Sequence, residues 1–510
     1  MSERAASSAE TAEASETAIA RTLATLDDHG DQAALSVDDG KSVVARWTYR
    51  DMLSEVYRES RRLDACGVPR GDVVAVLTGD TPRTFVLRWA VNTVGAAVTV
   101  LADGFAAAVI ADLLHTCGAG WVVTDSSRYS LVADAVARLA HPVTVLDLDA
   151  TPAPQDDSPC AVRARPGDLS SISLTSGSTG RPKAVPRYGP RLRPSPAAPA
   201  STPSPWRDAV QLLCTPVAHL GGNVIAQRVF ATGGRVVLQA GFDPASVLSA
   251  IARENVTTVH LMPRLLHELL DHPGLATSDT SSVRSLLLGG APASPDRVGE
   301  AVGRFGPIVA QGYGTTEAGN ICWITENELA QAALRDSVGR AVDGAEVSVR
   351  EPVSPGGDPG PAHQPGSIEA AGLGAALPTG RVGEVWVRTP MMMSGYLGDP
   401  EQTSVVLRGG WLSTGDLGSL DADGYLRLVG RTSEVIFAEH ARVYPTDVED
   451  GAPGRGERGG VRAGRRRRFG VGGGGGDGQA GPQPSPRGPR GLGARPARFA
   501  RDPADPACGG

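Results

Sequence analysis

The sequence of 510 residues lacks the features that would mark a membrane, secreted or zinc-binding protein. Its longest apolar run, 94–114, is broken by Asp103, Gly104 and Asp112, so it cannot supply the roughly 20 apolar residues of a bilayer span. The acidic, Ser- and Ala-rich N-terminus has no basic start or apolar core of a secretory signal. The six cysteines form no CxxC pair, which argues against a disulfide framework and against a zinc site. We therefore expect a cytoplasmic protein with no membrane span.

Acidic and basic residues are distributed unevenly along the chain. Residues 451–510 hold 12 Arg against 4 acidic residues, a local charge of +8, whereas the first 450 residues carry −15. The same 60 residues contain 19 Gly and 8 Pro without any periodicity, which predicts a disordered tail. No aromatic platform or base-reading motif accompanies the arginines, so no nucleic-acid partner is expected. Residues 1–20 are also predicted to be disordered.

Between these ends, short apolar runs alternate with amphipathic stretches. One helix is expected to begin at Thr48 as its N-cap, to present an apolar stripe through Leu53, Val56, Tyr57 and Leu63, and to end at Gly67. Repeated strand and helix signals predict an α/β fold, with parallel sheets covered by helices. The expected strands lie at 72–78, 120–125, 142–148, 234–239 and 284–290.

The pattern changes at about residue 340. Short alternating runs at 345–350 and 383–389, separated by Gly- and Pro-rich turns, indicate an antiparallel or β-barrel-like subdomain. Two further segments, 187–206 and 351–380, show neither helical nor strand periodicity and predict loops or disorder.

The segment SLTSGSTGRPKAVP, residues 173–186, combines hydroxyl side chains, glycines and one of only two lysines in the chain. Hydroxyls and bare backbone amides can surround phosphate oxygens, and a lysine adds a mobile positive charge. A P-loop would require GxxxxGK[ST], but no hydroxyl follows the lysine here. A flexible surface turn is the alternative interpretation. We predict a polyphosphate cradle formed by Thr175, Ser176, Gly177, Ser178, Thr179, Gly180 and Lys183.

Four further motifs follow this loop in order: LLLGGAPAS at 286–294, QGYGTTEAG at 311–319, GWLSTGDLG at 410–418 and GRTSEVI at 430–436. Together with the loop they resemble the adenylate-forming superfamily, which includes acyl-CoA synthetases, aryl-acid ligases, luciferases and peptide adenylation domains. The resemblance extends from about Thr48 to Glu449. It implies an adenylate-forming domain over 21–430, and a hinge with the start of a small C-terminal domain over 431–450.

The resemblance assigns roles that the side-chain chemistry supports. The small turn of Gly290, Ala291 and Pro292 would leave room for adenine opposite the ring of Tyr313. Thr316 would offer a hydroxyl to the α-phosphate, and Glu317 a hard oxygen ligand to Mg²⁺.

Asp416 would accept hydrogen bonds from the ribose, and Arg431 would reach the ribose or phosphate from the hinge. His219 would border the acyl pocket. Leu220 follows it where many dihydroxybenzoate-type ligases carry Asn, which argues against a simple catechol acid. No nearby aspartate could bind the amino group of an amino acid, so a fatty or aryl acid is favoured.

The implied reaction uses ATP and Mg²⁺ to convert a carboxylic acid to an acyl-adenylate, which then passes to a thiol of CoA or of a carrier-protein phosphopantetheine. The chain departs from the family pattern near its end. Phe437 stands where lysine is common, Glu439 and His440 replace a Gly pair, and no lysine occurs in 451–510.

Two explanations of this end compete: a truncated relative, catalytically impaired or silent, or a slipped reading frame near codon 450. The Arg-rich, Lys-poor composition favours the second. Translation of the other frames beyond codon 450 would distinguish them.

Overall fold

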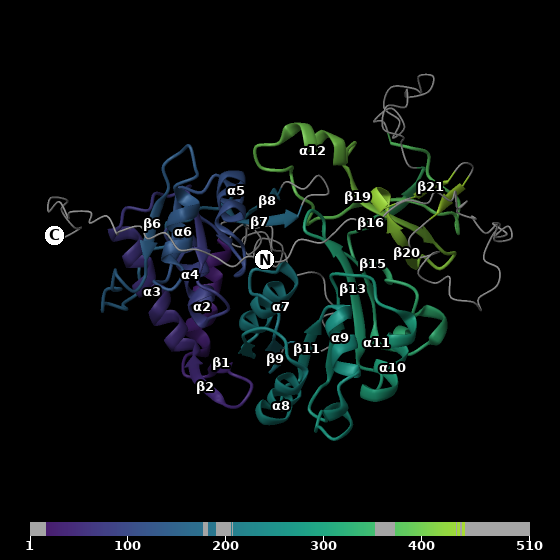
Figure 1. Ribbon diagram of the computed structural model, residues 1–510, viewed down its shortest axis with the longest axis horizontal. Coiled ribbons are helices and arrows are strands. Elements are labelled where there is room, and N and C mark those ends of the chain that lie inside the picture. The colour runs from purple at the N-terminus through teal and green to yellow at the C-terminus, as the bar shows by residue number, and fades with distance from the viewer. Residues whose placement is uncertain are drawn as a thin grey trace, which may run out of the picture. The chain divides into compact units, whose positions relative to one another are not determined.

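The computed structural model covers most of the chain between Thr17 and Val443 (Figure 1). The chain divides into two units, Met1–Val448 and Glu449–Gly510, and all described residues belong to the first. The predicted tail at 451–510 thus lies outside the described residues. The structure describes residues 17–176, 182–189, 206, 208–351, 373–434, 436–438 and 441–443.

A six-stranded sheet forms first along the chain, in the order β6-β5-β3-β4-β7-β8. Neighbouring strands are parallel, except that β7 and β8 form an antiparallel hairpin. The strands are β3 (Val73–Leu77), β4 (Ala97–Val100), β5 (Trp121–Thr124), β6 (Thr144–Asp147), β7 (Leu169–Ser176) and β8 (Pro182–Tyr188). The helices between them are α4 (Pro82–Thr93), α5 (Ala107–Cys117) and α6 (Tyr129–Val136).

A nine-stranded sheet has the order β15-β14-β13-β12-β11-β9-β10-β1-β2. Its central strands from β13 to β1 are parallel, and antiparallel strands lie at both edges. The strands are β1 (Ala33–Asp38), β2 (Val43–Thr48), β9 (Val210–Leu213), β10 (Arg235–Gln239), β11 (Thr258–Leu261), β12 (Ser285–Leu288), β13 (Val309–Thr315), β14 (Gly319–Ile324) and β15 (Arg340–Ala341). Its helices are α7 (Leu220–Ala231), α8 (Pro244–Glu254), α9 (Pro263–Leu270), α10 (Pro295–Phe305) and α11 (Glu326–Leu329).

Three buried apolar clusters stack these two sheets and their helices into five layers. The first lies between the sheets and joins Val74 and Val98 to Val236, together with residues of α2 (Ala18–His29), α3 (Tyr49–Ala65), α4 and α7. The second packs α8, α9 and α10 against the other face of the nine-stranded sheet. The third packs α5 and α6 against the outer face of the six-stranded sheet. The predicted α/β fold is confirmed.

The antiparallel subdomain expected beyond residue 340 is also present. Its pairing order is β16-β17-β19-β18, with β20 paired to β19, and every pairing is antiparallel. Helix α12 (Pro400–Val406) precedes β18, and a separate hairpin of β21 and β22 follows (Figure 1). The strands are β16 (Glu346–Arg350), β17 (Gly383–Arg388), β18 (Leu407–Arg408), β19 (Trp411–Leu420), β20 (Leu426–Arg431), β21 (Ile436–Ala438) and β22 (Ala441–Val443).

Helix α3 shows how the sequence specifies an element. The Thr48 hydroxyl accepts a hydrogen bond from the Asp51 amide at 3.0 Å, while the Asp51 carboxylate accepts from the Thr48 amide at 2.7 Å, a reciprocal capping box. Val56 and Leu63 are fully buried, and Gly67 follows the helix at φ +82°, a conformation that favours glycine. The helix predicted after Thr48 is confirmed.

Two boundaries differ from the sequence prediction. The disorder predicted for 1–20 extends too far, because Thr17 caps α2 by accepting a hydrogen bond from the Ala20 amide at 3.2 Å, and Ile19 is buried. The loop predicted for 187–206 begins too early, because Tyr188 still pairs with Leu169 at the end of β8. Arg431 ends β20, and the domain boundary predicted there stays a prediction.

Candidate active site

Three of the five predicted motifs contribute residues to one buried apolar cluster, to which all three sheets also contribute. The cluster contains Val185 of β8, Tyr313 of β13, Cys322 of β14, and Val387 and Leu412 of the antiparallel sheet. Segments that are distant in sequence therefore meet at this junction. Five side chains predicted as site residues make direct contacts there, either with each other or through a shared neighbour: Lys183, Tyr313, Glu317, Asp416 and Arg431.

The predicted phosphate loop connects the two strands of the β7–β8 hairpin. Thr175 pairs with Lys183, and Ser176 with Pro182, so the two ends of the loop lie side by side. Gly177, Ser178, Thr179 and Gly180 lie outside the described residues, and their role stays a prediction. The Nζ atom of Lys183 lies 5.0 Å from the centre of the Tyr396 ring, within cation–π range.

The small-residue turn follows β12, at the carboxyl edge of the parallel strands where ligands of α/β sheets usually bind. Gly290 has φ +84°, which a side chain would strain, and Ala291 and Pro292 are exposed beside it. A Cβ atom on Gly289 would lie only 3.5 Å from the Gly312 carbonyl oxygen of β13. The turn is therefore open to solvent next to the strand that carries Tyr313.

Asp416 lies between Tyr313 and Arg431. The Tyr313 hydroxyl donates to Asp416 Oδ2 at 2.6 Å, and Arg431 Nε lies 3.3 Å from Oδ1 across the β19–β20 pair. Burial raises the pKa of Asp416, although the Tyr313 hydrogen bond and the Arg431 charge oppose this. Burial and the adjacent Asp416 carboxylate raise the pKa of Tyr313. Arg431 is largely exposed. The hydrogen bond that joins the predicted base and ribose motifs was not foreseen.

Glu317 occupies the turn between β13 and β14, next to Thr316. The Tyr396 hydroxyl donates to Glu317 Oε1 at 2.9 Å, and within the described part of the chain Oε2 makes no hydrogen bond. Arg187 ties this turn to the segment that precedes Tyr396, because its guanidinium donates to the carbonyl oxygens of Thr316 and Met391. Sequence reasoning missed both Tyr396 and Arg187. The only local signal for Tyr396 is its position between glycines in SGYLG.

Two neighbouring histidines lie near the small-residue turn. His219, predicted at the acyl pocket, is the exposed N-cap of α7. His260 of β11 was not predicted; its Nδ1 is buried without a hydrogen-bond partner among the described residues. Cβ atoms on Gly221 and Gly289 would lie 3.1 and 3.5 Å from its ring. Burial, with a smaller effect of His219, lowers the pKa of His260 to about 4, so the imidazole is neutral at pH 7. The sequence signal that could have indicated His260 is a polar residue within the otherwise apolar strand TVHL.

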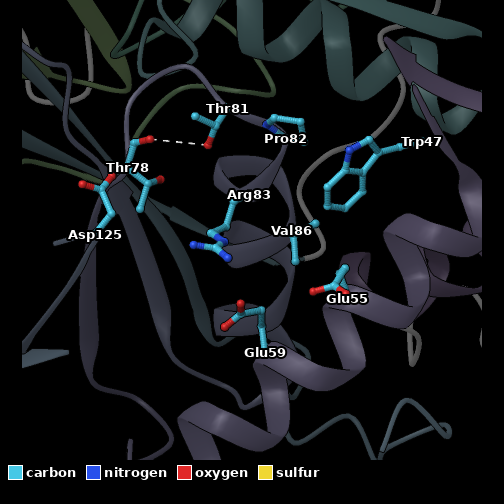
Figure 2. A pocket seen from close by; sticks show the side chains of 9 residues that line it. All are labelled: Trp47, Glu55, Glu59, Thr78, Thr81, Pro82, Arg83, Val86 and Asp125. Carbon is cyan, nitrogen blue, oxygen red and sulfur yellow. Dashed lines mark hydrogen bonds between the residues drawn. The ribbon is translucent and has the colours of Figure 1, made fainter. Parts of the chain in front are cut away.

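A separate pocket of about 320 Å³ lies between α3 and α4, beyond the carboxyl ends of β3 and β5 (Figure 2). None of the predicted site residues lines it. Its charged lining residues each have a partner of opposite charge, so we assign it no ligand. The pairs are Glu55 with Arg58, Glu59 with Arg62, Arg83 with Asp149, and Asp125 with Arg128.

Glu317 fits the metal that the resemblance implies. A carboxylate with one oxygen held by a neutral hydroxyl and one available is the hard ligand that Mg²⁺ takes together with phosphate oxygens. No cluster of three or more His, Cys, Asp or Glu able to hold a metal ion occurs among the described residues. In the same part of the chain, no helix is both long and apolar enough to cross a bilayer.

Comparison with known proteins identifies the family. The AMP-binding enzyme family matches residues 24–397. A feruloyl-CoA synthase from an Amycolatopsis species is 31% identical over 412 residues, which cover 80% of this chain and 78% of the relative. The medium/long-chain fatty-acid–CoA ligase FadD8 of Mycobacterium tuberculosis is 28% identical, over 79% of this chain and 70% of the relative.

A solved structure extends this similarity. The amide bond synthetase McbA from Marinactinospora thermotolerans matches with a TM-score of 0.69 and 34% identity, over 84% of this chain and 83% of that one. The chain therefore belongs to the AMP-binding, adenylate-forming family of enzymes. The resemblance inferred from the five motifs is confirmed.

Proposed function

We propose that this protein is an AMP-forming ligase that activates a fatty or aryl carboxylic acid. A carboxylate oxygen of the acid attacks the α-phosphorus of ATP, the bond to the bridging oxygen of pyrophosphate breaks, and acyl-AMP forms. A thiolate of CoA or of carrier-protein phosphopantetheine then attacks the acyl carbonyl, and AMP leaves. Family membership and the names of the similar ligases support this proposal.

The first step requires positioning and charge neutralisation rather than acid–base catalysis, because the carboxylic acid is already ionised at neutral pH. Lys183 would offset the charge of the departing pyrophosphate, and the loop hydroxyls would hold its oxygens. Asp416 and Tyr313 would fix the ribose and base, Thr316 the α-phosphate, and Arg431 the ribose or phosphate. Glu317 would hold Mg²⁺, which when bound supplies charge neutralisation between the phosphates.

One observation carries the proposal. Tyr313 with Asp416, and Glu317 with Lys183 through Tyr396, come from separate elements yet surround one apolar cluster. The test is exchange of labelled pyrophosphate into ATP with a panel of fatty, benzoic and cinnamic acids. Exchange that depends on the acid is expected. Its absence, with ATP or AMP still binding by calorimetry, would instead favour a silent nucleotide-binding relative, which the comparisons do not support.

A second candidate keeps the adenylate but changes the acceptor to an amine. The similar solved structure described above is that of an amide bond synthetase. In addition, this chain has Glu439 and His440 where the family commonly has a Gly pair that pantetheine approaches. Product analysis separates the candidates: preformed acyl-AMP is offered CoA, phosphopantetheinylated carrier protein or a simple amine. A thioester product supports the first proposal, and an amide formed without a thioester supports the second.

His219 and His260 are proposed to border the acid. The neutral, unpaired Nδ1 of His260 is a polar group in an apolar wall, so it favours acids with a hydrogen-bonding substituent, such as a phenol, over simple alkyl chains. The acid panel tests this preference directly, because benzoic and hydroxybenzoic acids differ by one such group.

A further inference from the structure

We propose that Tyr396 is a positioning residue of the adenylation site, whose hydroxyl orients Glu317 toward the metal and whose ring holds the ammonium group of Lys183 nearby. This inference rests on the proposed function. The two contacts use different parts of one side chain, since the hydroxyl lies 2.9 Å from Glu317 Oε1 and the ring centre 5.0 Å from Lys183 Nζ.

The backbone around Tyr396 is tied to both halves of the site. The Tyr396 amide donates to the Thr403 hydroxyl of α12 at 2.9 Å, and the next amide, of Leu397, donates to the carbonyl oxygen of Ala184 at 2.9 Å. Ala184 directly follows Lys183 on β8. Three residues earlier than Tyr396, the Met393 amide donates to the Glu317 carbonyl oxygen at 2.7 Å. The residue as a whole is 9% exposed. Tyr396 is therefore fixed relative to both residues that it contacts.

This arrangement keeps two opposite charges close but separate. Within the described residues no ion pair joins Lys183 to Glu317; Lys183 contacts the ring of Tyr396, and Glu317 accepts from its hydroxyl. A direct salt bridge would occupy the ammonium and the carboxylate with each other. Held on Tyr396 instead, the ammonium stays available for phosphate and Oε2 for the metal. The flexible lysine stem also has fewer conformations to lose when ATP binds.

The molecule contains a second tyrosine with the same two kinds of contact, which provides a matched control. The Tyr425 hydroxyl donates to Glu328 Oε1 at 2.8 Å, and the Arg340 guanidinium lies 5.0 Å from the Tyr425 ring centre. There, however, Arg340 also pairs with Glu328 at 2.9 Å, and Glu328 Oε2 accepts from the Thr325 amide at 2.8 Å. In this second cluster, the four residues Tyr425, Glu328, Arg340 and Thr325 thus bind one another.

The test measures ATP affinity by calorimetry as a function of Mg²⁺ concentration, with AMP binding as a reference that needs neither β- nor γ-phosphate. Tyr396→Phe keeps the ring and removes the hydroxyl. We expect it to raise the Mg²⁺ concentration for half-maximal enhancement of ATP binding by about 10-fold, and to leave Mg²⁺-free ATP binding unchanged. Tyr396→Leu removes the ring as well, and should also weaken Mg²⁺-free ATP binding several-fold. AMP affinity should stay unchanged in both variants.

Tyr425→Phe and Tyr425→Leu should leave all three measurements at the wild-type values. If Tyr396→Leu melts well below Tyr425→Leu, Tyr396→Met replaces it as the variant without a ring. A wild-type Mg²⁺ dependence in Tyr396→Phe, together with wild-type ATP affinity in the ring-deleted variant, would overturn the positioning role while leaving the proposed function intact. Absence of ATP binding by the wild-type protein would reject the proposed function itself.

Discussion

The clusters around Tyr396 and Tyr425 have the same composition, a tyrosine hydroxyl on a glutamate and a cation over the ring, but they differ in how their charges are used. At Tyr425 the cation pairs with the glutamate, which also caps α11. Burial opposes ionisation of Glu328, yet the hydrogen bonds from Thr325 and Tyr425 and the charge of Arg340 outweigh it and lower its pKa. At Tyr396 the cation and the glutamate do not pair.

The comparison shows that side-chain type alone does not define a site. Glu328 is saturated by partners and stabilises a short helix. Among the described residues, Glu317 keeps one oxygen available, and the nearby Lys183 has no carboxylate partner. Available, correctly placed charge is what binding of a polyphosphate and its metal requires. The predictions below separate a functional from a structural cluster.

The largest expected effect is a loss of pyrophosphate exchange, and it should distinguish the cations of the two clusters, Lys183 and Arg340. Lys183→Ala should reduce acid-dependent pyrophosphate exchange by about 10²–10³-fold, the cost of removing one preorganised donor. AMP affinity should change by less than about 2-fold, because AMP lacks the β,γ charge that Lys183 offsets. Arg340→Ala should leave exchange unchanged. A Lys183→Ala variant that loses AMP binding as strongly as exchange would contradict the assignment of Lys183 to pyrophosphate.

Substitution of Glu317 should weaken ligand binding, whereas substitution of Glu328 should lower stability. Glu317→Gln should weaken Mg²⁺-dependent ATP binding by at least about 10-fold without changing the melting temperature. Glu328→Gln should leave ATP binding unchanged and cost about 1 kcal/mol of stability, since it removes the ion pair with Arg340 and weakens the cap. Calorimetry and thermal unfolding of both variants check this. Equal effects of the two substitutions on Mg²⁺ dependence would remove the distinction between the clusters.

His260 provides a pH test of a half-buried ring whose Nδ1 is buried and has no hydrogen-bond partner among the described residues. Its folded pKa of about 4 lies below the ordinary value, so the unfolded chain binds the proton preferentially as the pH falls from about 7 to 4. Stability should therefore decrease over this range by about 1 kcal/mol more in the wild type than in His260→Gln. The full shift would give about 3 kcal/mol, but the ring is only partly buried and solvent screens it. Parallel pH profiles of the two proteins would show that His260 titrates normally.

Local pattern was sufficient for the elements and motifs. The capping box of α3 and the apolar run of β3 act between neighbours in sequence, so the residues themselves determine them. The motif residues Tyr313 and Asp416 were found because each stands in a recognisable stretch, although their mutual hydrogen bond spans 103 positions.

Tyr396, Arg187 and His260 could not be found in this way. The Tyr396–Glu317 contact spans 79 positions, and it depends on the placement of the segment from Thr389 to Leu397 against β8 and the turn between β13 and β14. No periodicity or local spacing encodes that placement. The buried Nδ1 of His260 likewise has meaning only once α7 and the turn after β12 pack against the ring.

The most direct test of the central claim follows the oxygen atoms. An acid that supports pyrophosphate exchange is labelled with ¹⁸O in its carboxylate and incubated with ATP, Mg²⁺ and an acceptor until AMP accumulates, and the AMP is analysed by mass spectrometry. Attack of the carboxylate on the α-phosphorus predicts AMP that carries one ¹⁸O atom, transferred when the acyl–oxygen bond of the adenylate breaks. Unlabelled AMP, or label found in inorganic phosphate with formation of ADP, would contradict adenylation of a carboxylic acid at this site.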